Sequence, residues 1–429
     1  MTNTTAAVLL PESTPAPSPD TLAAILKADC VPMETLHEKY GPVLQLVRTL
    51  IGVVPNCDAY LEIWPPAFRS YNVMVPNLLN LPFSVFGVGS ARAGHMGLAM
   101  YVASRSAECP YCSAHSCSFA LRRGASPEKL ARALLGDGDF SSAELAIIAV
   151  ARSLGTVPCR LTNAERQALV QHLGLDGAEW VVCAIVMMGF LNKFMDGIGV
   201  ELEPTTFAET RALMGAGWSP RKAGRDLDLA SAPTAAPERD SLWTKARVVP
   251  LAPGARKLDK EWQRGVPDAW ADVGPWLRQR TGHDFPVLSR LRSSRVIRAV
   301  AMMLRDNLDP ATSVIGLETK ILAGIIFASV VEDESLEQEV RALAARHGVS
   351  ADALDAAKRA EVPSLNRQRR ALLSLARAAS TSPARVDAAI VRECQEAGLS
   401  AAGIVELITW LSVLQMMHRL SSYFVASSH

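Results

Sequence analysis

Apolar residues recur three and four positions apart in almost every segment after residue 20, which is the spacing of one face of an α-helix. No segment alternates apolar and polar residues between turn signals, as a half-buried strand does. The pattern predicts helices from Ser141 to Leu154, capped by Ser141 or Ser142, and from Asn163 to Leu173 after Thr162. A third helix is expected over 177–193, followed by an exit loop, MDGIGVELEP. The predicted fold class is all-α.

The two halves of the chain repeat the same order of patterns. Gly124 and Gly348 are 224 positions apart (348 − 124), and so are Gly174 and Gly398 (398 − 174), each pair at the expected end of a helix. Similar helical segments follow these glycines in both halves. We therefore predict two tandem helical bundles that arose by duplication of one unit.

The predicted boundaries follow from composition. Residues 1–19 lack periodicity and are expected to be a mobile N-terminal tail, and residues 20–216 form the first bundle. Residues 217–245 are rich in Pro, Ala, Ser and charge, which is typical of a linker. Residues 246–429 form the second bundle.

Composition and charge exclude several partners. The 429 residues include 44 Lys plus Arg and 43 Asp plus Glu, so a formal charge of +1 gives no basic surface for nucleic acid or an anionic membrane. The N-terminus has no basic region before its short apolar run, and apolar stretches such as VVCAIVMMGFL are shorter than the ~20 residues that cross a bilayer. We expect a cytoplasmic protein, in which a close cysteine pair is more often catalytic or metal-binding than structural.

The strongest chemical signal is the segment AECPYCSAHSCSFALRRG, residues 107–124. Pro110 suits the first position of a helix, which places Cys109 at the N-cap, and Gly124 suits the position after the helix end. Cys112 follows Cys109 by one turn and His115 follows Cys112 by one turn, so the three side chains share one stripe. The spacing predicts a redox-active dithiol with an adjacent histidine.

A helix N-terminus and a nearby imidazolium both lower the pKa of a cysteine, so a reactive thiolate is expected here. Cys112 could attack a peroxide and be resolved by Cys109, or Cys109 could attack a disulfide first. The sequence leaves this order open.

The second half offers an internal comparison. Shifting Cys109, Cys112 and His115 by 224 positions gives Asp333, Leu336 and Glu339. The second bundle therefore has no thiols at the corresponding place and is predicted to be a degenerate, inactive copy that supplies packing surface or pocket walls.

The segments CPYCSAH, GASPEKL and NKFMDGIGVELEP resemble the cysteine-pair branch of the alkylhydroperoxidase D and carboxymuconolactone decarboxylase family, over roughly residues 60–210. The resemblance implies an all-α enzyme that reduces peroxides with a Cys-x-x-Cys pair, which a dithiol partner then reduces again. It also implies that Cys112 is the peroxidatic cysteine and Cys109 the resolving one.

Two positions depart from the family pattern. The family's histidine follows the second cysteine by four residues, where this chain has Ser116, and His115 stands at three instead. The family's proton-relay glutamate corresponds to Gly97. His95 or Glu108 is the expected substitute, and a weakened or altered peroxidase activity follows.

Other interpretations remain. Zinc binding by Cys109, Cys112, His115 and Cys117 is disfavoured, because one helix cannot wrap four ligands around an ion. No dinucleotide or phosphate loop is present, so we expect no cofactor and no bound metal.

Alternatives to a peroxidase or disulfide reductase are a non-redox decarboxylase-like enzyme acting on a small organic acid, and a non-catalytic helical scaffold. The expected partners are a small peroxide or disulfide and a dithiol reductant protein, with the chain as a monomer or homodimer.

Overall fold

The computed structural model describes residues 18–214, 235–361 and 365–424. Every regular element in these ranges is a helix, which confirms the all-α fold class. The predicted tail, residues 1–19, lies outside the described residues except for its last two positions.

The helices of the N-terminal half surround the cysteine pair. In chain order they are α1 (Leu22–Leu26), the 3₁₀ helix η1 (Lys27–Asp29), α2 (Met33–Ile51), α3 (Cys57–Leu61), α4 (Pro65–Leu78), α5 (Phe83–Phe86), α6 (Ala93–Ser106), α7 (Pro110–Arg122), α8 (Pro127–Arg132), α9 (Ser142–Gly155), α10 (Asn163–Ile198) and α11 (Pro204–Met214).

The helices of the C-terminal half follow residue 241. They are α12 (Leu242–Trp262), α13 (Trp270–Thr281), the 3₁₀ helix η2 (Pro286–Arg290), α14 (Ser294–Asn307), α15 (Leu317–Val330), α16 (Glu334–Arg346), α17 (Ala351–Lys358), α18 (Arg367–Ser380), α19 (Ala388–Glu396) and α20 (Ala401–Phe424).

Local sequence signals set several of these boundaries. The Ser141 and Thr162 side chains each accept a hydrogen bond from a backbone N–H three residues later, and the glutamates at those later positions bond back, so α9 and α10 begin where predicted. Gly174 has a φ of 69°, which breaks the helical backbone inside α10. α10 thus consists of a short helix and a longer one, as the sequence predicts.

Two predicted boundaries are wrong. The expected exit loop after 193 is helical as far as Ile198, because Gly199 rather than an earlier residue takes the left-handed conformation that ends the helix. The last residues of the predicted linker, 242–245, belong to α12, because Ser241 and Thr244 form a cap at its start. Most of the remaining linker, residues 217–234, lies outside the described residues.

Helix starts in the two halves keep a constant offset. α15 begins 224 residues after α6 (317 − 93), α16 begins 224 after α7 (334 − 110), and α17 begins 224 after α8 (351 − 127). The offset becomes 225 at α18 relative to α9 (367 − 142). Duplication of one unit predicts such a constant offset between corresponding helices, and it remains our prediction for the origin of the two halves.

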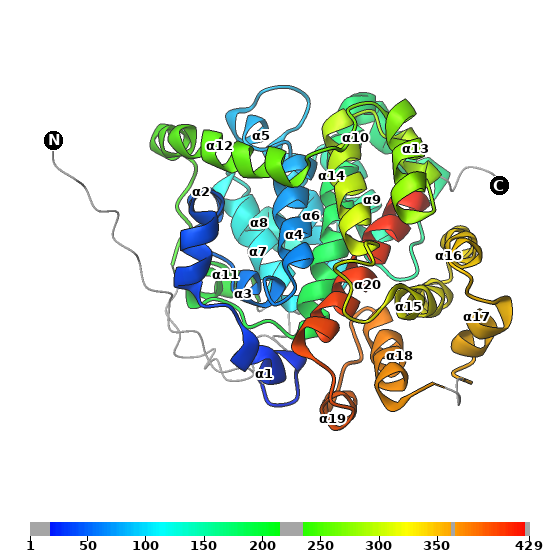
Figure 1. The fold of residues 1–429 in the computed structure, drawn as a ribbon. Coiled ribbons are helices and arrows are strands. Elements are labelled where there is room, and N and C mark those ends of the chain that lie inside the picture. Colours follow the sequence, from blue (N-terminus) through cyan, green and yellow to red (C-terminus); the bar gives the residue numbers. More distant parts are fainter. Residues whose placement is uncertain (1–17, 215–234, 362–364, 425–429) are drawn as a thin grey trace.

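The two halves pack against each other through a few long helices. α20 lies beside α10 in the most extensive helix–helix contact of the described chain (Figure 1). α14 lies beside α4, and α12 lies beside α2. One continuous apolar core contains residues of both halves. The second half therefore supplies packing surface to the first, as predicted.

In the described part of the chain, α10 and α20 are the helices long and apolar enough to span a membrane by length and composition. Their most apolar windows are 94% and 89% buried within the protein. Burial against each other and the remaining core accounts for their composition, since core helices of folded domains share it.

Candidate functional site

The cysteine pair lies at the start of α7, as the sequence predicts. Cys109 is the N-cap, with an extended backbone, and Pro110 is the first helical residue. The Cys109 carbonyl accepts a hydrogen bond from the backbone N–H of Ser113 at 3.0 Å. Gly124, with a φ of 88°, follows the helix end. Both thiols are free and buried, and the Cys112 side chain is in hydrogen-bond contact with Cys109.

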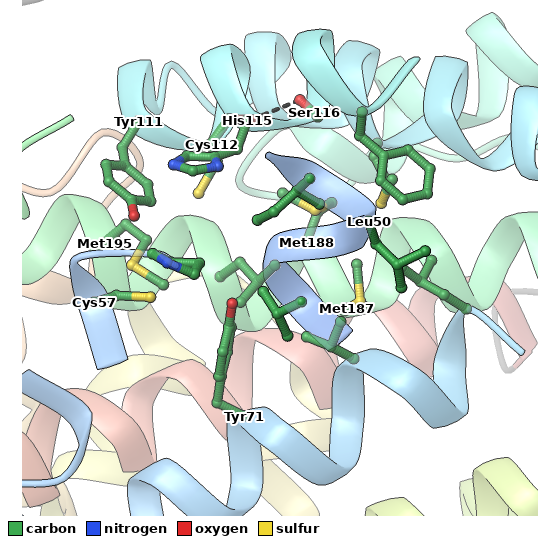
Figure 2. Close-up of a pocket in the computed structure, with 18 of the residues that line it drawn as sticks. Leu50, Cys57, Tyr71, Tyr111, Cys112, His115, Ser116, Met187, Met188 and Met195 are labelled. Carbon is green, nitrogen blue, oxygen red and sulfur yellow. Dashed lines mark hydrogen bonds between the residues drawn. The ribbon is translucent and has the colours of Figure 1, made fainter. Parts of the chain in front are cut away.

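Cys112 lies in the wall of a cavity of about 100 Å³. Figure 2 shows Cys112 and His115 on one helix, facing the methionines of α10 and Tyr71 of α4 across the cavity. The lining is almost entirely apolar or aromatic and comprises Val47, Leu50, Ile51, Pro55, Cys57, Tyr71, Val75, Leu79, Leu81, Met100, Tyr111, Cys112, His115, Ser116, Phe119, Met187, Met188, Leu191 and Met195. All of these residues belong to the N-terminal half, so the prediction that the second half supplies walls is wrong for this cavity. Met187 and Met188 of α10 are buried and also line it.

His115 pairs with a glutamate that the sequence analysis did not select. Its Nε2 lies 2.6 Å from Oε2 of Glu203, in the segment between α10 and α11. The Tyr111 hydroxyl donates to Oε1 of Glu203 at 2.7 Å, and the backbone N–H of Asn56 donates to the same oxygen at 2.6 Å. Glu203 is 4% exposed and His115 is 15% exposed. The carboxylate is therefore fully partnered, while the imidazole also faces the cavity.

The pKa of Glu203 is lowered, although its burial alone would raise it. The charge of His115 and hydrogen bonds from His115, Asn56 and Tyr111 outweigh the desolvation of the carboxylate. Glu203 is thus held ionised beside His115, in a position to stabilise a protonated imidazole.

The expectation of a low-pKa thiolate is wrong for Cys112. Burial raises the pKa of this thiol well above its usual value, and the neighbouring thiols Cys109 and Cys57 raise it further. The helix N-terminus does not compensate, because desolvation of a thiolate in an apolar wall is the larger effect. Cys112 is a neutral thiol at rest and needs a base to become a nucleophile.

A third thiol lies at the same cavity. Cys57, the first residue of α3, is fully buried and in hydrogen-bond contact with the hydroxyls of Tyr71 and Tyr111. Burial raises its pKa well above the usual value. Tyr111 thereby connects Cys57 to Glu203 and His115. These side chains form one hydrogen-bonded series along the otherwise apolar wall of the cavity.

The other two predicted residues lie outside this arrangement. His95 is near the start of α6, its charged neighbours are Arg92 and Glu144, and it does not line the cavity. Burial, followed by the charge of Arg92, lowers its pKa. Glu108 is adjacent to Cys109 in sequence but is exposed, with a φ of 53°. The structure thus brings together Cys109, Cys112 and His115 and adds Glu203, Tyr111 and Cys57.

Gly97 has no room for a larger side chain. A Cβ atom built there would lie 3.1 Å from Cα and 3.2 Å from Cβ of Ala120, on the helix that carries the cysteines. The close contact of α6 with α7 explains why a glycine is required. Glu203 provides a carboxylate at the histidine instead.

Gly97→Ala should therefore destabilise the protein by roughly 1–3 kcal/mol, because α6 and α7 must move apart. Gly94→Ala, on the same helix with open space around its Cβ, is the matched control and should be neutral or stabilising by up to about 1 kcal/mol. Urea denaturation of both variants measures the difference. Equal midpoints for the two variants would contradict the packing argument.

A buried carboxyl next to Cys57 in the sequence gives a pH-dependent stability. Burial raises the pKa of Asp58 to about 7, and its main hydrogen-bond partner is Asn72, at 3.5 Å. Because the folded state holds this proton up to a higher pH than the unfolded chain does, stability is lost as pH rises from about 4 to about 7.

Asp58→Asn should remove this dependence, since the amide stays neutral. We expect the variant to gain stability over the wild type between pH 4 and pH 8, by up to roughly 4 kcal/mol if the full pKa difference is realised. Denaturant titrations at pH 4, 6 and 8 measure this. A constant difference between the two proteins at all three pH values would contradict it.

No group of three or more His, Cys, Asp or Glu side chains close enough to hold a metal ion occurs in the described ranges. Cys117, which the zinc interpretation also requires, is buried in α7 and does not line the cavity.

No family model matches this chain, and no curated protein matches it. Among solved structures, the debrominase Bmp8 in its apo form is similar, with 18% identity and a TM-score of 0.38 over 44% of this chain and 95% of that one. A cysteine-to-alanine variant of that debrominase in complex with 2,3,4-tribromopyrrole gives the same identity and TM-score over 43% of this chain and 94% of that one. Both are structures of an enzyme, and the similarity is too distant to bear on the chemistry of this chain.

Proposed function

We propose that this protein is a thiol-dependent oxidoreductase that reduces small apolar hydroperoxides, as the resemblance to the cysteine-pair branch of the alkylhydroperoxidase D family implies. The observation that carries the proposal is the Cys112 thiol in the wall of an apolar cavity, in contact with the Cys109 thiol behind it. Such a pair can cycle between dithiol and disulfide without a bound cofactor.

The first step is activation of Cys112. His115, one turn further along α7, takes the thiol proton, and the Glu203 carboxylate stabilises the imidazolium that forms. The thiolate attacks the distal oxygen of the hydroperoxide, so that an S–O bond forms as the O–O bond breaks. The leaving alkoxide takes the proton from His115 and departs as an alcohol.

The second step uses Cys109. Its thiol attacks the sulfenic sulfur of Cys112, a disulfide forms, and the sulfenic oxygen leaves as water. An external dithiol reduces the disulfide by exchange and is itself oxidised. Oxidant and reductant are thus both substrates.

The cavity supports an apolar substrate. Its lining consists mainly of aliphatic side chains, methionines and aromatic rings, and its polar groups cluster at Cys112, His115 and Tyr111. An alkyl or aryl hydroperoxide places its peroxide oxygens at these groups and its carbon skeleton among the methionines.

Steady-state assays with a dithiol reductant test the proposal. Cumene hydroperoxide should be consumed with a higher kcat/KM than hydrogen peroxide, because only the former gains from burial in the apolar wall. Consumption no faster than the uncatalysed rate for both peroxides would exclude the peroxidase. A preference for hydrogen peroxide would exclude the assignment of the cavity as the substrate site.

A further inference from the structure

Another cysteine, which does not line the cavity, lies beside a histidine and a carboxylate. Cys159 lies in the loop between α9 and α10, His418 is on α20, and Asp333 is the N-cap of α16. The group is therefore assembled from both halves of the chain. Asp333 occupies the position 224 residues after Cys109 (333 − 109) and, like Cys109, caps its helix.

The three residues form a chain of polar contacts. Nδ1 of His418 lies 2.6 Å from Oδ2 of Asp333, and the other oxygen of this carboxylate accepts the backbone N–H of Leu336 at 2.9 Å. The backbone N–H of Cys159 donates to Nε2 of His418 at 3.4 Å, and the Cys159 and His418 side chains are also in hydrogen-bond contact. The Cys159 thiol also lies 3.4 Å from the carbonyl oxygen of Leu154, to which it donates when protonated. Asp333 thus fixes the ring, with Nε2 directed at the cysteine.

The charges around this thiol favour its ionised form. Burial alone would raise the pKa of Cys159, but the charge and hydrogen bond of His418, the charge of Arg419 and a hydrogen bond from Ser422 lower it below the usual value. Burial lowers the pKa of His418, but Cys159 and Asp333 raise it to about 9. Glu339 is a further ionisable group close to Asp333, and the thiols of Cys109 and Cys112 also interact with Arg419.

The contrast with Cys112 is clear in the contacts. The buried guanidinium of Arg419 interacts with Cys159 and also with Cys109 and Cys112, so the difference is the imidazole of His418, which only Cys159 has beside it. Cys159 is also partly exposed, while Cys112 is buried. Cys159 therefore combines a histidine partner with a position nearer the surface than that of Cys112.

We propose that Cys159, His418 and Asp333 form a second reactive site, at which the Cys159 thiolate exchanges with small disulfides to give a mixed disulfide. Cys159 is absent from the lining of the peroxide cavity, although the Arg419 guanidinium interacts with the cysteines of both sites. Disulfide exchange suits it because the reaction requires a thiolate and no bound cofactor.

The step balances within the site. The Cys159 sulfur attacks one sulfur of the disulfide, the new S–S bond forms as the old one breaks, and the departing thiolate takes the proton of the His418 imidazolium. Asp333 keeps the ring oriented during this transfer. No further oxidant or reductant is needed.

Pulse alkylation of the reduced full-length protein with iodoacetamide between pH 5.5 and 9, followed by peptide mapping, tests the activation. We expect the labelling of Cys159 to have its midpoint at least about one pH unit below the ~8.5 of an ordinary thiol. In His418→Gln, labelling at pH 6 should fall at least tenfold, and Asp333→Asn should act in the same direction with a smaller effect. Incubation with oxidised glutathione should give an adduct on Cys159 that Cys159→Ser abolishes.

Cys30 is the internal control, because it is also partly exposed but burial raises its pKa to about 12. Cys30 should be labelled slowly in all folded variants. Rapid labelling of Cys30 in His418→Gln would show that this variant is unfolded. The comparison of Cys159 labelling would then be made between the wild type and Asp333→Asn. A wild-type midpoint for Cys159 at or above ~8.5, the same midpoint in the folded variants, or no adduct with oxidised glutathione would each overturn the proposal.

Discussion

Cys112→Ser should lose dithiol-dependent consumption of cumene hydroperoxide, with a decrease on the order of 10³-fold or more in kcat/KM. Serine keeps the size of the side chain, but its hydroxyl cannot form the sulfenic acid and disulfide on which turnover depends. Cys112 is the cysteine of the pair that lines the cavity, so Cys109 should not replace it. Peroxide loss followed spectroscopically in the presence of excess dithiothreitol gives the ratio.

Cys117→Ser is the matched control for this variant. Cys117 lies on the same helix and is equally buried, with a pKa raised to about 12 by burial, but it does not line the cavity. Its substitution should change turnover less than about twofold. If Cys112→Ser retained wild-type turnover, the dithiol mechanism would have to be abandoned.

Glu203→Gln should lower kcat for the hydroperoxide by about 100-fold, within the range attributed to general acid–base groups. The amide can still accept a hydrogen bond from Tyr111, but it cannot stabilise the imidazolium that forms when His115 takes the Cys112 proton. Glu203 does not line the cavity, so KM should change little. Glu203→Asp, which keeps the charge, should recover part of the loss.

The pH profile distinguishes this role from a purely structural one. Because His115 must be neutral to take the Cys112 proton, and the lowered pKa of Glu203 keeps a negative charge beside it, Glu203→Gln should move the acid limb of the kcat profile to lower pH. Glu201→Gln is the control, because Glu201 is equally buried in the same segment but bonds to Tyr60 instead. A parallel loss in both variants, or a rise in KM alone, would argue against proton transfer through Glu203.

The features predicted correctly from sequence are those set by local interactions. Pro110 and Gly124 delimit α7, and the capping pairs at Ser141 and Thr162 start α9 and α10, because each depends on groups within a few residues. The Cys-x-x-Cys spacing is likewise local. The boundaries of these helices can therefore be predicted without knowledge of the tertiary structure.

Glu203 could not be selected from sequence because its partner is 88 residues away. It reaches His115 only because α10 returns the chain to α7, and Asn56 completes the site from a third segment, before α3. The segment NKFMDGIGVELEP contains the glutamate and contributes to the family resemblance, which was the one available signal. His95 and Glu108 were favoured by nearness in sequence, which does not measure distance in space.

The pKa of Cys112 shows how burial changes a local rule. A cysteine near a helix N-terminus with a histidine one turn away is expected to ionise easily. In the folded protein the histidine is turned toward Glu203, and the thiol is enclosed by apolar side chains and a second cysteine. Desolvation then outweighs the helix terminus.

The central claim is that Cys112 and Cys109 exchange two electrons with a peroxide bound in the cavity. Treating the reduced protein with one equivalent of cumene hydroperoxide in the absence of reductant, and mapping its disulfides by mass spectrometry, tests this directly. The account predicts a Cys109–Cys112 disulfide, with two thiols lost for each peroxide consumed. Unchanged thiols, or a disulfide that leaves Cys109 free, would contradict it.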